Sequence, residues 1–521
     1  MPVHLINPSD NSFGTAVITP RWLFVLAAAT PASMGDPILV DECLEQLDPE
    51  TIHAGDVVGI SVHTGNALRG YEVGKAAHAR GATVVYGGIH ATLFPEEPFE
   101  RGMADVVVKD DGDIAWGKVL CDLQAGCAKR TYEGGRIDGD EFVSARWDLM
   151  QTDKYMWASV QTIRGCPKHC SFCSVWRTDG QKPRHRSFER VIDEIIELRR
   201  MGFRFIALAD DNFYPVTLTD LRLAREQNNL EKVESLLQVR SERFALMAEL
   251  AKLPNDMVFF TQITMESAED PEYLEAMRRA HIRGALVGVE AVTPEGLKAI
   301  YKDFNCSGDQ LIEQLRTFRQ HGVHVLGSFI FGLPTDKPGT FDATVELALK
   351  ADVAFAQFVM MTPFPGTIDF ARWEKEQSKN PTLVTGTPIT RYWLIPRGLR
   401  PNLFMPHPTM SAAEIRERTQ KVWDRFYEFT AIWKRASCTP NLRARAGFVL
   451  ISKLYRQMYA GTGLATDSAR RRRANRSARW IARQTRKMFQ AKPMPDLAYP
   501  VWAPRANRLP QLTQLKAPLP N

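Results

Sequence analysis

The chain has 521 residues, of which 44% are hydrophobic and 24% are charged. This composition is ordinary for a soluble globular protein, and it excludes a disordered, collagenous or disulfide-stapled chain. At roughly 100–200 residues per domain, the length predicts about three domains. The first ten residues lack the features of a signal peptide, and the longest apolar run, residues 22–29, is shorter than the roughly 20 residues that span a bilayer. We therefore expect a cytoplasmic protein.

The first 145 residues alternate short apolar runs with helical patterns. Continuous β-branched runs such as VVGISV are typical of strands buried on both faces. Strands that alternate with helices indicate a parallel sheet wound on both faces, with ligands beyond the carboxyl ends of the strands. Strands are predicted at 3–6, 38–40, 57–62, 82–86 and 104–108, and a helix at 70–80.

The alternation restarts near residue 156 and continues through six βα repeats, which is typical of a barrel or partial barrel of parallel strands. Polar residues or glycines close nearly every strand, and in such a barrel this rim carries the chemistry. The predicted strands are 158–164, 203–209, 257–265, 285–290, 325–331 and 355–361.

The predicted fold is therefore α/β in three parts. A doubly wound, Rossmann-like parallel sheet occupies residues 1–145, and a (β/α)6 partial TIM barrel occupies 150–380. A mainly helical region follows at 381–521, with helices expected at 412–429 and 443–458.

Three of the eight cysteines, Cys166, Cys170 and Cys173, have the spacing Cys-x3-Cys-x2-Cys. Thiolates select zinc or iron–sulfur clusters. A structural zinc site needs four ligands, and no fourth cysteine is near in the sequence. Three thiolates on a loop after the first barrel strand suit three irons of a four-iron cluster, with the fourth iron open to another ligand. Zinc, or a coincidental spacing, is the alternative.

The segment CPKHCSFC (166–173) resembles the CxxxCxΦC signature of the radical S-adenosylmethionine (SAM) enzymes. In that family the open iron binds SAM, and an electron from an external donor of flavodoxin or ferredoxin type yields a 5′-deoxyadenosyl radical. INPS, VVGISV, YGGIHATLFPEE and TPFPGT are similar to the class with an N-terminal cobalamin-binding domain, over about residues 1–370. That class includes C-methyltransferases, hopanoid methylases and the anaerobic cyclase of bacteriochlorophyll synthesis.

The resemblance implies a [4Fe–4S] cluster on the three cysteines, together with sites for SAM and cobalamin. Asp210 and Asp211 are candidates for catalytic proton transfer, with a helix cap as the structural alternative. The residues expected to contact SAM are Phe172, Asp211, Gln262, Glu290 and Ser328. Those expected to contact cobalamin are Ser61, His63, Thr64, Gly87, Gly88, His90 and Thr92. Glycines let backbone amides approach a macrocycle closely, although most Gly-Gly pairs are turns.

Two features depart from the pattern of the class. The motif Asp-x-His-x-x-Gly, whose histidine binds cobalt from below, is absent, so the lower cobalt ligand is unassigned and His63 and His90 are its nearby candidates. After the fifth strand, relatives often read Gly-Glu-Gly-Glu, whereas this chain reads Asp110-Asp111-Gly112-Asp113. The first glycine, the residue type that allows the closest backbone approach, is therefore replaced.

The net charge of +6 is unevenly distributed, because residues 468–492 hold eight arginines, two lysines and no acid. Apolar residues, among them Trp480 and Ile481, lie between these cations. A basic amphipathic helix of this kind suits the anionic inner face of a membrane. A solvated tail is the alternative, and nucleic-acid binding is the least favoured.

The sequence therefore predicts a cobalamin-dependent radical SAM C-methyltransferase acting on an unactivated carbon of a lipid-like or other small molecule. The first alternative is a ring-forming or oxidative radical SAM enzyme without methyl transfer. The second is a non-enzymatic sensor that binds nucleic acid through its tail, which six strands with polar ends disfavour.

Overall fold

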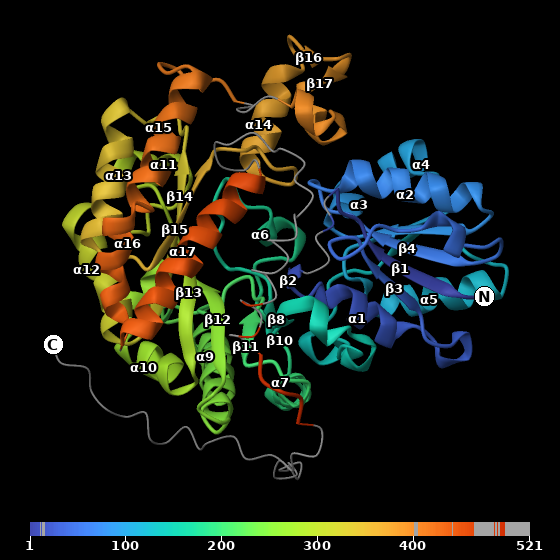
Figure 1. The fold of residues 1–521 in the computed structure, drawn as a ribbon, viewed down its shortest axis with the longest axis horizontal. Helices are drawn as coiled ribbons and strands as arrows, with labels where there is room; N and C mark the ends of the chain where they lie inside the picture. Colours follow the sequence, from blue (N-terminus) through green and yellow to red (C-terminus); the bar gives the residue numbers. More distant parts are fainter. Residues whose placement is uncertain are drawn as a thin grey trace.

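The computed structural model describes residues 1–10, 12, 16–400, 405–439, 441–462, 484, 487 and 490–494. Two parallel β-sheets lie side by side, the N-terminal sheet on the right of Figure 1 and the barrel sheet on the left. The predicted α/β fold class is confirmed. Most of the basic stretch 468–492, with its predicted membrane surface, lies outside the described residues.

The N-terminal sheet has the strand order β3-β1-β4-β5-β6-β7, and all its strands are parallel. Apolar side chains of β4 are buried on both faces, where α1 and α5 cover one face and α2 the other. The strands are β1 (Val3–Asn7), β3 (Ile38–Asp41), β4 (Val57–Ser61), β5 (Thr83–Gly87), β6 (Val106–Lys109) and β7 (Thr131–Glu133). The helices are α1 (Arg21–Ala29), α2 (Ala67–Ala79), α3 (Ile89–Leu93), α4 (Glu97–Arg101) and α5 (Gly112–Gln124).

The second sheet is an open half-barrel with the order β15-β14-β13-β12-β11-β8-β2. Its edge strand β2 (Ala16–Ile18) comes from the N-terminal segment and pairs with β8. The other strands are β8 (Tyr155–Val160), β11 (Phe205–Leu208), β12 (Val258–Ile263), β13 (Ile282–Glu290), β14 (His324–Phe331) and β15 (Phe355–Met360). The helices are α7 (Phe188–Arg200), α8 (Leu218–Glu226), α9 (Leu230–Leu250), α10 (Pro271–Arg279), α11 (Pro294–Ala299), α12 (Gly308–Gln320) and α13 (Pro338–Lys350).

The described part of the C-terminal region, which lies mostly before residue 463, is mainly helical, as predicted, and it contacts both sheets. Trp423 Nε1 donates to the carbonyl of Phe358, 2.8 Å away, which holds α15 against β15. Trp393 is fully buried in the core on the α2 side of the N-terminal sheet. The elements are α14 (Ile368–Gln377), β16 (Leu383–Val384), β17 (Thr387–Pro388), the 3₁₀ segment Ile389–Leu394, α15 (Ala412–Phe426), α16 (Phe429–Arg435) and α17 (Leu442–Thr462).

A shared core joins the two sheets. Side chains of α1 and α5 belong to the same apolar cluster as those of the barrel strands. At the start of α1, Arg21 donates to Glu194 of α7, 2.9 Å away, and both side chains are buried. The two sheets are therefore packed as one body, with α1 between them (Figure 1).

Gly139, on the connection between the sheets, gives a test of this packing. A Cβ there would lie 1.5 Å from the backbone oxygen of His185, in β10 (Arg184–His185). Because backbone yields less easily than a side-chain end, we expect Gly139→Ala to cost about 2 kcal/mol of stability and to lower the Tm in thermal unfolding. In the control Gly339→Ala, the Cβ meets nothing within 4 Å, and Tm should hold or rise slightly. A parental Tm for Gly139→Ala would contradict the packing described.

Candidate functional site

The three cysteines lie on the loop between β9 (Ile163–Arg164) and α6 (Val175–Thr178), beyond the carboxyl end of β8. Cys170 is buried, and Cys166 and Cys173 are half-buried. Hydrogen bonds fix the loop near its start and in its middle: Cys166 N donates to Gly180 O at 3.0 Å, and Ser171 Oγ donates to Asp369 Oδ2 at 2.9 Å. The thiols are therefore held in place by the folded chain.

Burial raises the pKa of all three thiols, to about 11 for Cys170 and about 12 for Cys173. Such an environment disfavours free thiolates, so a bound metal's positive charge is what would keep them ionised. Among the described residues, no three His, Cys, Asp or Glu side chains converge on a single ion. A four-iron cluster needs no such convergence because each thiolate binds a different iron, and the three loop cysteines fit that donor set.

Two of the predicted SAM contacts, Phe172 within the cysteine loop and Glu290 at the end of β13, both lie near Lys302. The Lys302 ammonium donates to Glu290 Oε1 at 3.0 Å, with both side chains buried, and lies 5.8 Å from the centre of the Phe172 ring. Burial lowers the pKa of Lys302, but Glu290 and Cys170 raise it above its ordinary value overall. Glu290 has a φ of 65° at a register shift of β13, a strained conformation typical of functional sites. Sequence reasoning missed Lys302.

Asp210 and Asp211 bind the backbone at the base of the cysteine loop. Asp210 is buried and accepts hydrogen bonds from Thr162 and from Ile163 N. Asp211 accepts from Gly165 N at 2.7 Å. Burial, followed by the nearby Asp179 carboxylate, raises the pKa of Asp211 to about 7. Both residues therefore support the loop in this structure, and their catalytic role stays a prediction.

Gln262 and Ser328 face the inside of the half-barrel. Gln262 is exposed although its strand is central, and helices cover the outer face of the sheet. The register places Ser328 on the same face, where it accepts from Gln357 at 3.0 Å. Their contact with SAM stays a prediction.

A cavity of about 270 Å³ lies where the carboxyl ends of the N-terminal strands meet the barrel. Of the predicted cobalamin residues, Ser61, Gly87 and Gly88 line it. Gly88 has a φ of 91°, and a Cβ there would lie 2.7 Å from Ser61 Oγ, so this turn requires glycine. Lining residues that sequence reasoning missed include Trp22, Trp116, Gln161, Arg164 and Ala209.

The other four predicted cobalamin residues lie outside the cavity lining. His90 is buried, and both ring nitrogens have partners: Thr64 Oγ1 at 3.3 Å and Glu97 Oε1 at 3.1 Å. Thr92 accepts from Asp110 N at 2.8 Å. His63 is exposed, and its ring accepts from the backbone N–H of Gly65. Their contact with a cofactor stays a prediction, and His90 is placed as a buried support.

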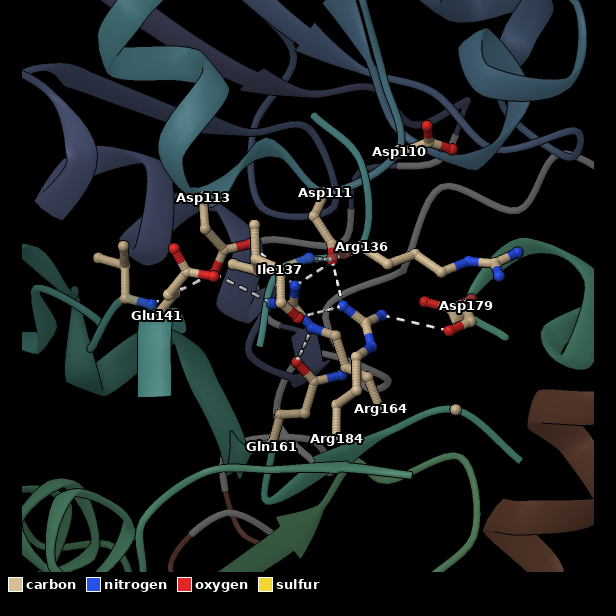
Figure 2. Close-up of polar contacts among 12 residues, drawn as sticks. Asp110, Asp111, Asp113, Arg136, Ile137, Glu141, Gln161, Arg164, Asp179 and Arg184 are labelled. Carbon is tan, nitrogen blue, oxygen red and sulfur yellow. Dashed lines mark hydrogen bonds and ion pairs between the residues drawn. The ribbon is translucent and has the colours of Figure 1, made fainter. Parts of the chain in front are cut away.

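The cavity and the cysteine loop are joined by an interdomain ion-pair network, drawn in Figure 2, of Arg164, Arg184, Asp111 and Asp113. Arg164 Nη1 lies 2.9 Å from both Asp111 Oδ1 and Asp113 Oδ2. Its guanidinium also stacks over the Phe142 ring, 4.0 Å from the centroid. The two aspartates follow β6 of the first sheet, whereas Arg164 lies two residues before Cys166.

Asp110 occupies the position where relatives often have glycine, and its φ of 61° lies in the left-handed region. Aspartate tolerates this conformation better than most residues do. The chain therefore forms this left-handed turn before Asp111 with an aspartate in place of glycine.

Residues 160–348, which include the cysteine loop and most of the barrel, match the Radical SAM superfamily model. The chain therefore contains a radical SAM domain. This radical SAM protein is 28% identical to an uncharacterized methyltransferase of Pyrococcus horikoshii, over 63% of this chain and 70% of the relative. It is 27% identical to the hopanoid C-2 methylase of Rhodopseudomonas palustris (69% and 65%). It is 23% identical to the anaerobic magnesium-protoporphyrin IX monomethyl ester cyclase of Rubrivivax gelatinosus (70% and 68%).

Among solved structures, the fold resembles the radical SAM methyltransferase TsrM of Kitasatospora setae, solved with cobalamin and a [4Fe–4S] cluster. The TM-score is 0.61 at 16% identity, covering 88% of this chain and all of that one. The cobalamin-dependent radical enzyme OxsB gives 0.64 at 13% identity, covering 94% and 75%. This likeness supports the predicted arrangement of two sheets and a helical C-terminal region.

The ion-pair network predicts a large effect from a single carboxylate. Asp111→Ala would leave the buried guanidiniums of Arg164 and Arg184 short of a partner, so we expect a loss of about 3 kcal/mol and a lower Tm in calorimetry. The control Asp36→Ala removes an exposed partner of Arg146 and should change stability by about 1 kcal/mol or less. Equal effects of the two substitutions would refute a structural role for the network.

Proposed function

We propose that this radical SAM protein is a cobalamin-dependent C-methyltransferase. The observation that carries the proposal is that Arg164, two residues before the first loop cysteine, both lines the cavity at the strand ends of the N-terminal sheet and belongs to the interdomain ion-pair network. This geometry lets one substrate lie between two cofactors. Methyl transfer is favoured because two relatives that match more than 60% of this chain are named as a methyltransferase and a methylase.

The residues present fit all three cofactors. Cys166, Cys170 and Cys173 would hold the [4Fe–4S] cluster, and Phe172 and Glu290, which both lie near Lys302, would contact SAM. The cavity lined by Ser61, Gly87 and Gly88 would enclose part of cobalamin, which is larger than the cavity. When bound, the cluster and SAM supply a deoxyadenosyl radical, and cobalamin supplies a methyl carrier.

The chain itself contributes position and exclusion of water. Lys302 fixes the Glu290 carboxylate, and the hydrogen bond from Gly165 N to Asp211 fixes the start of the cysteine loop. The interdomain network keeps the two cofactor sites at a constant separation. Fixed geometry of this kind supplies the orientation that a radical transfer needs.

The partners are a small-molecule substrate and an external reductant. An apolar, lipid-like substrate is favoured because the hopanoid methylase relative acts on a hopanoid. Contact with an anionic membrane through 468–492 is a further part of the proposal and comes from the sequence alone. Of the helices in the described part of the chain, none is long and apolar enough to cross a bilayer.

A second candidate function is ring formation or oxidation without methyl transfer, which the cyclase relative favours. The discriminating experiment incubates the anaerobically reconstituted protein with SAM, a reductant and cobalamin. S-adenosylhomocysteine and 5′-deoxyadenosine are then quantified together. Methyl transfer predicts both products. S-adenosylhomocysteine should form even without the substrate, because cobalamin itself accepts a methyl group from SAM, and deoxyadenosine should form by cleavage of a second SAM. Deoxyadenosine alone would favour the second candidate.

Cluster assembly should require each cysteine of the loop. Cys166→Ala, Cys170→Ala and Cys173→Ala should each abolish the visible absorbance and most of the bound iron and sulfide after reconstitution. Cys121→Ala, which removes an exposed cysteine on α5, is the matched control and should keep the parental iron content. Full iron loading in any of the three loop variants would refute this ligand set.

Cobalamin retention should depend on the space at Gly87. A Cβ there meets nothing closer than the Val108 carbonyl at 3.8 Å, so Gly87→Ala should fold and retain cobalamin. Gly87→Phe should fill the cavity and reduce the cobalamin kept after desalting about tenfold or more, as read from the visible spectrum, without changing iron content. Equal retention by the two variants would place cobalamin elsewhere.

A further inference from the structure

Three exposed cations, Arg136, Arg177 and Lys182, form a surface that we call the cationic patch. Backbone contacts bring them together. Arg136 Nη2 donates to the backbone carbonyl of Arg177 at 2.7 Å, and the Arg136 side chain lies against Gly180. In Figure 2 the Arg136 side chain extends away from the interdomain network. The patch is thus a local feature, contributed by the domain connection and the segment after the cysteine loop.

The patch differs from the other cations around the cysteine loop. Arg164, Arg184 and Arg186 are buried and pair with carboxylates of Asp111, Asp113 and Glu194, and Lys168 pairs with Glu266. Among the described residues, the ion pairs include none from the three patch cations. The one acid of segment 164–186, Asp179, is half-buried, and its pKa is raised by burial. Arg177 and Lys182 therefore have no ion-pair partner within their own segment, whereas Arg136 acts electrostatically on the exposed Asp110.

The patch lies directly against the backbone that holds the first cluster ligand. The Gly180 carbonyl, between Arg177 and Lys182, accepts the N–H of Cys166 at 3.0 Å. A Cβ on Gly165 would lie 2.7 Å from the Lys182 carbonyl, so these two chain segments are in close contact. A protein bound on the patch would thus be separated from the cluster site by little more than one layer of backbone.

We propose that the cationic patch is the docking surface for a small acidic electron carrier of flavodoxin or ferredoxin type. This rests on the proposed function, because the docked carrier reduces the [4Fe–4S] cluster. One electron leaves the carrier's reduced flavin or iron–sulfur centre and enters the cluster, and no bond forms or breaks. Charge complementarity supports this partner, since an acidic carrier is steered to a surface of exposed cations close to its electron acceptor.

The first test is binding, which needs no turnover. The affinity of a purified acidic flavodoxin for the full-length protein is measured by calorimetry at low ionic strength. Charge reversal in Arg177→Glu/Lys182→Glu should weaken binding about tenfold or more and flatten its salt dependence. The control Arg279→Glu/Lys350→Glu reverses two exposed cations at the C-terminal ends of α10 and α13, which precede the starts of β13 and β15 at the end of the barrel away from the cysteine loop. It should leave the affinity within about twofold.

The second test is the rate of cluster reduction, followed by loss of visible absorbance. With reduced flavodoxin, the patch variant should be slowed about tenfold, whereas dithionite should reduce it at the parental rate. Parental affinity and rate in the variant would overturn the docking proposal, as would an equal loss with dithionite, which would show damage to the loop. A parent protein that binds flavodoxin but assembles no reducible cluster would overturn the proposed function while the binding result stands.

Discussion

The buried charges between the two sheets are the constraint on which the rest of the site depends. The side chains of Arg164 and Arg184 extend from the segment that holds the cysteines and form ion pairs with Asp111 and Asp113, which follow β6 of the N-terminal sheet. Removing one partner from such a network destabilises the fold strongly, whereas the whole network adds little stability over apolar contacts of the same size. The network therefore acts mainly to fix the position of the two sheets relative to each other. Here it fixes the cysteine loop against the edge of the cavity, and cofactors bound at the two places would keep one relative position.

Burial also explains why the cysteine loop suits metal binding and why the reactive groups belong to the cofactors. The thiols of Cys170 and Cys173 have raised pKa values because they are removed from water, so the loop is poorly suited to free thiolate chemistry and well suited to metal binding. Lys302 lies beside the same loop and holds Glu290 in a strained conformation at the end of its strand. The protein contributes rigid positions around a protected space, whereas the reactive groups are the cofactors' own.

Much of the fold was predictable because apolar runs of β-branched residues mark the strands. The strands from β4 to β6 and the six main barrel strands lie within a few residues of their predicted positions. The three-residue strands β2 and β7 were missed, since so short a segment has no periodicity to read. The attachment of Trp393 to the N-terminal core was also missed, because a contact across some 300 residues leaves no local pattern.

The site was predicted unevenly for a similar reason. Spacing marks the cysteines, and a glycine pair after a strand marks Gly87 and Gly88, so these positions carry a local signal. His90 follows the same glycine pair in the sequence, but its ring is buried and hydrogen-bonded to Glu97 and Thr64. Lys302 has no local signal, because only the fold brings it to Glu290. Arg164 lies two residues before the first cysteine, but its partner Asp111 is 53 residues away in the sequence.

We propose above that this chain transfers a methyl group from SAM to carbon. The most direct test incubates the reconstituted protein anaerobically with trideuteromethyl-SAM and separate lipid and tetrapyrrole extracts, followed by mass spectrometry. Methyl transfer predicts a product that gains one trideuteromethyl group, and this product should be absent with Cys173→Ala or without cobalamin. Steady formation of deoxyadenosine with no label in any product and no S-adenosylhomocysteine would contradict it.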